Sequence, residues 1–426
     1  MNRKFLSVLV GLTLAAAPVA VFAQQAKKDA PKAEAKAVPK AAGPVKVSDG
    51  VVKIGILTDL SGYYSDLSGA GSVLAAKMAI EDFQAMEKGK AFPIELVSAD
   101  HQNKGDVASN KAREWFERDQ VDMIGDLVTT STALAVMPIA KEKNRITIVS
   151  GAAATLITGK NCTDTNVHYV YDTYALANGT GKAVVKQGGD TWFFVTADYA
   201  FGQALEKDTT AVVLANGGKV LGSVRHPSPG TDFSSFLLKA QSSGAKVIGL
   251  ANAGTDTTNS IKQAAEFGIT PKQSLAGLLM FITDIHSLGL KATQGMYLTE
   301  GFYWDLNDET RTWSKRFFEK HRRMPTMVQA GVYSSTMHYL KAVKAAGTDE
   351  AKAVMAKMKS TPVNDFFAKN AKIRDDGRLV HDFYLLQVKK PEESKTPWDY
   401  YHVRQVIPAN EAVMPVAQSE CPLLKK

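Results

Sequence analysis

Short apolar, β-branched runs recur along this chain, and most are followed by a longer stretch with helical spacing of its apolar residues. Such runs are typical of strands when turn residues bound them. The predicted strands span residues 53–57, 94–99, 121–127, 146–150, 192–197, 219–224, 247–251, 274–279, 296–299 and 381–388. The predicted helices span 70–87, 107–118, 132–144, 175–187, 202–216, 233–243 and 257–267, and a longer helical region covers 310–347 and 350–359.

The alternation of strands and helices predicts an α/β fold with parallel sheets. Many of the predicted strands are almost continuously hydrophobic, as expected when helices cover both faces of a sheet. Several helices stop at glycine, for example at Gly244 and Gly268, which favours left-handed caps. The strand–helix rhythm runs once to about residue 172 and again to about residue 302. Because this length exceeds one comfortable core, we expect two lobes.

The first residues have the pattern of a secretory signal peptide. Arg3 and Lys4 precede an apolar stretch over 5–21, and Val21 and Ala23 place small residues before a cleavage point after Ala23. The alternative is a membrane anchor, but the apolar stretch is near the short limit for a spanning helix. We therefore expect secretion and a mature protein in the periplasm.

Residues 24–50 differ in composition from the rest of the chain. They consist mainly of Ala, Lys and Pro, with no large apolar residue except valine, which predicts a disordered leader. Six lysines in this leader contribute to the formal net charge of +8. The remaining excess is spread along the chain rather than clustered, which argues against a nucleic-acid surface.

The chain has two cysteines, Cys162 and Cys421. In an oxidising compartment an even pair favours one disulfide, which would tie the C-terminal tail to the loop after residue 158. Two free thiols are the alternative. The sequence has no CxxC motif and no Cys/His ligand spacing, so we expect no structural zinc site.

Four predicted strands end in an acidic residue: Asp59, Asp100, Asp126 and Asp198. They fit either a divalent-metal cluster or the ordinary capping and turn roles of aspartate, and we favour the second because no phosphate-binding loop accompanies them. Hydrolase motifs such as GxSxG and HExxH are absent from the sequence, and its histidines are scattered. We therefore expect no enzymatic activity, no metal and no cofactor.

The segment GDLVTTST, residues 125–132, follows a strand and opens a helix with consecutive hydroxyls. Free amides and the positive end of the helix dipole suit an anionic or carbonyl group there. Residues 150–154, SGAAA, follow the next strand with side chains small enough for a ligand to approach the backbone. Ordinary capping and close packing are the alternative explanation for both segments.

Taken in order, these motifs resemble the Leu/Ile/Val-binding family of periplasmic substrate-binding proteins of ABC transporters. The resemblance covers about residues 51–390 and is carried by KIGILTDLSG, GDLVTTST, ITIVSGAAAT, VTADYAFGQAL, GTDFSSFLLKAQSSGAKVIGLA and IKQAAEFGI. It implies two Rossmann-like lobes joined by three crossovers, which close on the ligand like a hinge. We expect one lobe over 51–172 and 303–360, the other over 173–302 and 361–405, and a tail over 406–426 that returns to the first.

The resemblance also implies which residues contact the ligand. From the first lobe we expect the loop and backbone positions Tyr63, Tyr64, Ser65, Thr129, Thr130, Ser131, Ala152 and Ala153. From the second lobe we expect Tyr199, Phe201, Asn252, Gly254, Asp256 and Leu279, with Tyr174 beside them. In that family the hydroxyl run and the backbone at residues 152–153 hold the ligand carboxylate.

One position departs from the family pattern. Amino-acid binders of the family carry an acidic residue after a later strand that pairs with the ligand's ammonium group, whereas this chain has GLLMF over 277–281, with Leu279 at the corresponding place. An unpaired ammonium in a desolvated cleft is costly. We therefore expect an aromatic or branched carboxylate without an ammonium group, and an amino acid is less favoured.

The expected function is capture of this carboxylate by a monomer that delivers it to the permease subunits of an ABC transporter. A periplasmic ligand sensor, or an accessory subunit of a signalling or dehydrogenase system, is the alternative, because the fold does not determine the function. The aromatic stretch 302–304 either covers the hinge or packs in the core, and we favour packing.

Overall fold

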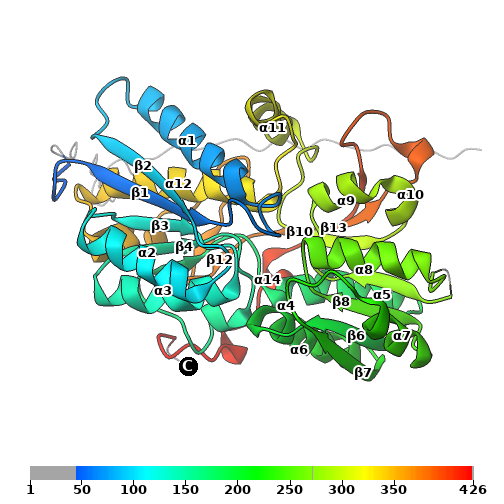
Figure 1. Cartoon of the computed structure of the whole chain (residues 1–426). Helices are drawn as coiled ribbons and strands as arrows, with labels where there is room; N and C mark the ends of the chain where they lie inside the picture. The colour runs from blue at the N-terminus through cyan, green and yellow to red at the C-terminus, as the bar shows by residue number, and fades with distance from the viewer. Residues whose placement is uncertain (1–44, 271, 425–426) are drawn as a thin grey trace, which may run out of the picture. The chain divides into compact units, whose positions relative to one another are not determined.

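The computed structural model describes residues 45–270 and 272–424. Two parallel sheets organise these residues, and the main elements of both are labelled in Figure 1. The predicted signal peptide and most of the predicted leader lie outside the described residues.

The first sheet has five parallel strands in the order β2-β1-β3-β4-β5. They span Val52–Thr58 (β1), Ile94–Asp100 (β2), Met123–Asp126 (β3), Ile146–Val149 (β4) and Asn166–His168 (β5). Helices α1 (Gly69–Met86), α2 (Gly105–Glu117) and α3 (Thr130–Glu142) connect the first four strands. Four of these strands match predicted runs within a few residues, and the short strand β5 was not predicted.

Both faces of this sheet are buried. On β1, Ile54 and Ile56 pack with α1 and with α12 (Met327–Ala346), whereas Leu57 packs on the other side with α2 and α3. Neighbouring side chains of a strand point to opposite faces, so a strand covered on both sides must be apolar throughout. Gly55 has no side chain because a Cβ there would lie 2.5 Å from the ring of Trp115.

The second sheet has four parallel strands in the order β7-β6-β8-β9. They span Thr191–Ala197 (β6), Lys219–His226 (β7), Val247–Ala251 (β8) and Ser274–Gly277 (β9). Helices α6 (Ala200–Ala215), α7 (Ser234–Ser242) and α8 (Thr255–Glu266) connect them, and α9 (Ile282–Leu288) and α10 (Leu290–Thr293) follow. The predicted helix over 175–187 is divided into α4 (Thr173–Leu176), a π-helical turn at Ala177–Gly181 and α5 (Lys182–Lys186).

A third, antiparallel sheet has the order β10-β13-β14, with strands Tyr297–Glu300, Phe383–Val388 and Tyr401–Ile407. The helical region predicted over 310–347 is two helices, α11 (Asp308–His321) and α12, followed by α13 (Ala351–Ser360). The helices α11 and α12 are separate because α11 ends at Arg322 in a left-handed cap, and Thr326 begins α12 with a capping box. A final short helix, α14, spans Ala409–Ala412.

The chain passes between the two parallel sheets at three places, so the α/β fold with two lobes and a three-crossover hinge is confirmed. The passages follow β5, β10 and β12 (Leu379–Val380), and β12 pairs with β11 (Lys372–Ile373). Residue Arg378 bridges to His168 of β5, so this hairpin contacts the first sheet although residues 361–405 were expected in the second lobe. The exact lobe boundaries stay a prediction.

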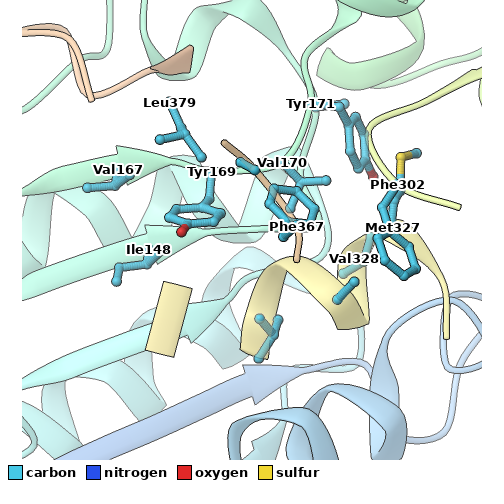
Figure 2. Close-up of a cluster of buried hydrophobic side chains, with 14 of the residues drawn as sticks. Ile148, Val167, Tyr169, Val170, Tyr171, Phe302, Met327, Val328, Phe367 and Leu379 are labelled. Atoms are coloured by element: carbon cyan, nitrogen blue, oxygen red, sulfur yellow. The ribbon is translucent and has the colours of Figure 1, made fainter. Parts of the chain in front are cut away.

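The crossovers pass through a continuous apolar core. Figure 2 shows Tyr169 and Val170 of the first crossover around Phe367, which stacks on Phe302 of the second crossover. Phe302 is fully buried, as the packing interpretation of residues 302–304 predicted. The predicted disulfide is also present: Cys162 is bonded to Cys421 and ties the C-terminal tail to the segment between β4 and β5.

Candidate functional site

A small cavity of about 10 Å³ lies between the two lobes. Its lining comes from the loops that follow the carboxyl ends of β1, β3 and β4 in the first sheet and of β6, β8 and β9 in the second, and from the first crossover. The lining residues are Tyr64, Leu67, Val128, Thr130, Gly151, Ala153, Tyr171, Tyr199, Phe201, Ala253, Leu279 and Phe281. Ligands of open α/β sheets bind at this edge of the strands.

The lining carries no ionisable group apart from tyrosine. Its polar groups are the Thr130 hydroxyl, three phenols and the backbone, and the rest is aliphatic or aromatic. Burial raises the pKa of Tyr64, Tyr171 and Tyr199 well above the ordinary tyrosine value. The phenols therefore stay protonated at neutral pH, and the Tyr171 hydroxyl donates to the Gly151 carbonyl oxygen.

Two of these phenols join the lobes. The hydroxyls of Tyr64, from the loop after β1, and Tyr199, at the start of α6, lie 2.8 Å apart in a hydrogen bond. Tyr63 packs its ring against Tyr64 with 4.3 Å between ring centroids, and burial raises the pKa of Tyr63 to about 12. The predicted loop is thus a contact surface between the lobes as well as a wall of the cavity.

Gly254 allows the lobes to approach each other closely. It has a φ of 59°, and a Cβ there would lie 2.7 Å from the Tyr63 carbonyl oxygen and 2.8 Å from the Tyr64 ring. Any larger residue would be strained in this conformation and would hold the lobes apart.

The hydroxyl run opens α3 beside the cavity. Thr129 is the N-cap, and its side chain accepts a hydrogen bond from the Thr132 amide, while Thr130 lines the cavity. Among the described residues, no protein group accepts a hydrogen bond from the Thr130 amide or the Ala153 amide. Two donors at a helix N-terminus and its neighbouring loop suit a carboxylate.

The backbone before this run is strained. Asp126 and Leu127 have φ values of 76° and 52°, a left-handed conformation that is unusual for both residue types. Asp126 is fully buried and accepts a hydrogen bond from the Ser68 hydroxyl, and burial raises the pKa of its carboxyl group. Strain that the surrounding fold holds in place is concentrated at functional sites, which supports a binding role for this turn.

Comparison with known proteins agrees with this geometry. The periplasmic binding protein family model matches residues 51–395. This chain belongs to that family. A solved periplasmic binding protein from Burkholderia mallei is 54% identical, with a TM-score of 0.86, and the match covers 88% of this chain and all of that one. The solved branched-chain amino acid ABC transporter periplasmic ligand-binding protein of Burkholderia xenovorans is 40% identical, with a TM-score of 0.78 and coverage of 87% and 99%.

More distant relatives differ in the ligands that their descriptions name. The Leu/Ile/Val-binding protein homolog 6 of Brucella melitensis is 25% identical over 72% of this chain and 80% of its own length. An ABC transporter solute-binding protein of R. palustris, solved in complex with benzoate, shares the fold at 22% identity and a TM-score of 0.72, over 84% and 96% of the two chains. The chain is a periplasmic ligand-binding protein of the ABC-transporter type, and the family alone does not determine its ligand.

Six of the predicted site residues of this binding protein line the cavity. They are Tyr64, Thr130, Ala153, Tyr199, Phe201 and Leu279. Three other predicted site residues do not line the cavity but make hydrogen bonds in the segments beside it. The Ser65 hydroxyl donates to the Gly62 carbonyl oxygen, the Ser131 hydroxyl donates to Thr129, and the Ala152 carbonyl oxygen bonds to the His168 ring.

Three more predicted residues, Asn252, Asp256 and Tyr174, lie in the second lobe outside the cavity lining. Asn252 bonds to His226 and accepts from the Thr257 hydroxyl, so its amide is occupied within that lobe. Asp256 accepts from the Ser228 hydroxyl and the Gly230 amide, which holds the loop before α7. Tyr174 is half-buried on α4 and is absent from the cavity lining.

Half of the lining was not predicted from the sequence. These residues are Leu67, Val128, Gly151, Tyr171, Ala253 and Phe281. Five of them lie within two residues of a predicted contact, so a window of two residues around each predicted contact would have included them. Tyr171 lies outside such a window, because it belongs to the first crossover. Its hydroxyl donates a hydrogen bond to the carbonyl oxygen of Gly151, another lining residue.

The described residues contain no group of side chains that could hold a metal ion. At the strand ends, Asp59 accepts hydrogen bonds from three loop amides and Asp126 accepts one from the Ser68 hydroxyl. Among the described helices, none is long and apolar enough to cross a membrane.

Proposed function

We propose that this protein captures a small carboxylate with an aromatic or branched apolar body between its lobes and delivers it to the permease of an ABC transporter. The absence of any charged side chain from the cavity lining within the described residues carries this proposal. A ligand ammonium group would lose its hydration and gain no charge partner there, whereas an apolar body would be fully accommodated.

The carboxylate end of such a ligand has suitable donors in the first lobe. The free amides of Thr130 and Ala153 and the Thr130 hydroxyl lie where the N-terminus of α3 meets the loop after β4. Neutral donors stabilise a carboxylate through charge-assisted hydrogen bonds, which are stronger than those between neutral groups. No basic residue is needed for this kind of recognition.

The apolar body of the ligand has a wall of matching chemistry in the second lobe. Phe201, Leu279 and Phe281 are all buried side chains of this wall. The relative solved with benzoate supports the proposal, since it shows that this fold can hold an aromatic acid.

Ligand entry requires the lobes to separate. A cavity of about 10 Å³ has room for roughly one water molecule, far less than any of these acids needs. Because the hydrogen bond between Tyr64 and Tyr199 spans the lobes, we infer that opening breaks it and that closure around the ligand rearranges it. The closed complex is the form that a permease would recognise.

The proposal also covers the compartment, the oligomeric state and the partners of the protein. We infer secretion through a signal peptide cleaved after Ala23, function as a monomer in the periplasm, and a partnership with permease subunits. The family of periplasmic ligand-binding proteins supports this setting.

Calorimetric titration of the mature protein with benzoate, 4-hydroxybenzoate and L-leucine tests the proposed ligand class. We expect at least one aromatic acid to bind more than about a hundredfold more tightly than leucine, because the leucine ammonium would be buried without a partner. Tight binding of leucine with no response to either aromatic acid would contradict the proposal.

A further inference from the structure

A buried acidic residue lies directly behind the loop that carries Tyr64. Asp59 is at the end of β1, and its side chain is fully buried. Its Oδ1 atom accepts hydrogen bonds from the Gly62 amide at 2.6 Å and the Ser61 amide at 3.3 Å. Its Oδ2 atom accepts from the Tyr64 amide at 2.8 Å. One carboxyl group thus accepts hydrogen bonds from three backbone amides of the loop.

The loop is shaped to fit this carboxyl group. A Cβ at Gly62 would lie 2.8 Å from both oxygens of Asp59 and 2.9 Å from the Asn103 side-chain nitrogen. Glycine at residue 62 therefore lets the loop backbone close over the carboxyl group. The aspartate does not cap a helix, which was one of the roles expected for an acid at a strand end.

A second loop holds the aspartate from the other side. The Asn103 side-chain amide donates to Oδ2 of Asp59 at 2.5 Å, and the Asn103 backbone amide donates to Nδ1 of His101 at 3.0 Å. His101 is fully buried, and its burial lowers its pKa to about 4. The ring is therefore neutral at physiological pH, and its Nδ1 atom can accept this bond.

These contacts connect the ends of β1 and β2 to the cavity wall. The Tyr64 amide is fixed by Asp59, and the Tyr64 hydroxyl meets Tyr199 of the other lobe. Tyr63, in the same loop, contacts Gly254 of the other lobe. The position of the carboxyl group thus determines where the first lobe presents both tyrosines.

We propose that Asp59 is a positioning residue of the binding site, which holds the loop of residues 61–64 in the conformation that places Tyr64 against the ligand and against Tyr199. It touches neither the cavity nor the other lobe, and it acts on the ligand through Tyr64. The effect on ligand affinity rests on the function proposed above, whereas the effect on the loop does not.

The substitution Asp59→Asn tests this role with almost no change in size. Both oxygens of Asp59 accept from N–H donors, so either orientation of the asparagine amide places its NH₂ group against another donor. Asp198→Asn is the matched control. Asp198 directly follows β6 at the corresponding place of the second sheet, but its side chain is exposed and bonds to the side chains of Gln203 and Arg225.

Hydrogen exchange measures the loop without any ligand. We expect Asp59→Asn to speed exchange of the Gly62 and Tyr64 amides by about tenfold, because a buried acceptor is lost, and Asp198→Asn to leave their exchange unchanged. If Asp59→Asn does not fold, Asn103→Gly replaces it. Asn103 has a φ of 57°, which glycine tolerates, and the loss of one donor should speed exchange by about threefold.

Calorimetry with benzoate, in native and Tyr64→Ala backgrounds, measures how the residue acts. We expect Asp59→Asn to weaken binding by about tenfold when Tyr64 is present and by less than about twofold when it is alanine. An equal loss in both backgrounds would overturn the proposal, as would native exchange rates in the variant. If benzoate does not bind the native protein, the proposed ligand fails, and exchange alone decides the role of Asp59.

Discussion

At the scale of single residues, the uncharged side chain of Leu279 distinguishes this cavity from the site expected in an amino-acid binder. Its side chain is buried and lines the cavity at the place where the sequence comparison expected an acid in amino-acid binders. Motifs at strand ends pointed to residues that line the cavity, such as Thr130 and Tyr199, because the ends of parallel strands face the site in folds of this class. Tyr171 could not be predicted in this way, since its position depends on the path of a crossover.

Leu279→Glu is expected to change the ligand preference. A carboxylate at this place should repel an acidic ligand and weaken benzoate binding by about a hundredfold, while it offers a partner for an ammonium group and strengthens L-leucine binding by about tenfold. Calorimetric titration of both ligands measures the two changes. Leu279→Gln is the control of equal size, and if it shifts both affinities as far as glutamate does, charge is not the cause.

At the scale of elements, the crossovers are held by buried polar groups. The Arg378 guanidinium is fully buried, bonds to Asp172 at 2.9 Å and donates to the His168 carbonyl oxygen at 3.1 Å. The Nε2 atom of His381 lies 2.6 Å from the Val170 carbonyl oxygen. These contacts join the first and third crossovers, the two segments that would bend in the proposed closure.

Sequence patterns predicted most of the strands in the two parallel sheets, but they missed the short, buried strand β5 and the half-exposed strand β14. Strands β6 and β8 have continuous apolar runs and were found, whereas β14 has four exposed residues between its buried ends. A half-exposed strand at the edge of a sheet leaves a weaker hydrophobic signal. The division between α11 and α12 was missed because it depends on the left-handed cap at Arg322, which no apolar spacing reports.

Two buried histidines at the crossovers, His168 and His381, lead to a prediction about stability in acid. Burial, and then the neighbouring Arg378 charge, lower the pKa of His168 and His381 to about 4. Between pH 6.5 and 4 the unfolded chain therefore binds more protons at these residues than the folded protein does, and their contribution to stability falls as the pH falls. His381→Gln removes one such site while it keeps a side-chain donor.

Urea unfolding measured at several pH values tests this effect. Below pH 6.5 the free energy of unfolding of His381→Gln should fall less steeply than that of the native protein, by about 1.4 kcal/mol per pH unit for the one missing site. His402→Gln is the control, because His402 lies on β14 outside the hinge. Parallel pH profiles of His381→Gln and the native protein would show that His381 is protonated equally in both states.

At the scale of the whole molecule, the structure is a pair of lobes in contact across a nearly filled cavity. Besides the tyrosine pair, the Asp208 carboxyl group of α6 accepts a hydrogen bond from the Thr155 hydroxyl, which follows β4 in the other lobe. The length and rhythm of the sequence predicted two lobes, but they could not show which surfaces touch. Those contacts join residues more than thirty positions apart, and such pairs leave no local pattern.

The central claim is that the site accepts an apolar carboxylate and rejects the same molecule with an ammonium group. Calorimetric titration with two matched pairs tests it: 3-phenylpropanoate against L-phenylalanine, and 4-methylpentanoate against L-leucine. Within each pair the apolar body and the carboxylate are the same. We expect the acid without the amine to bind more tightly in at least one pair, by about a hundredfold, because the uncharged lining leaves an ammonium unpaired. Tighter binding of the amino acid in both pairs would contradict this account.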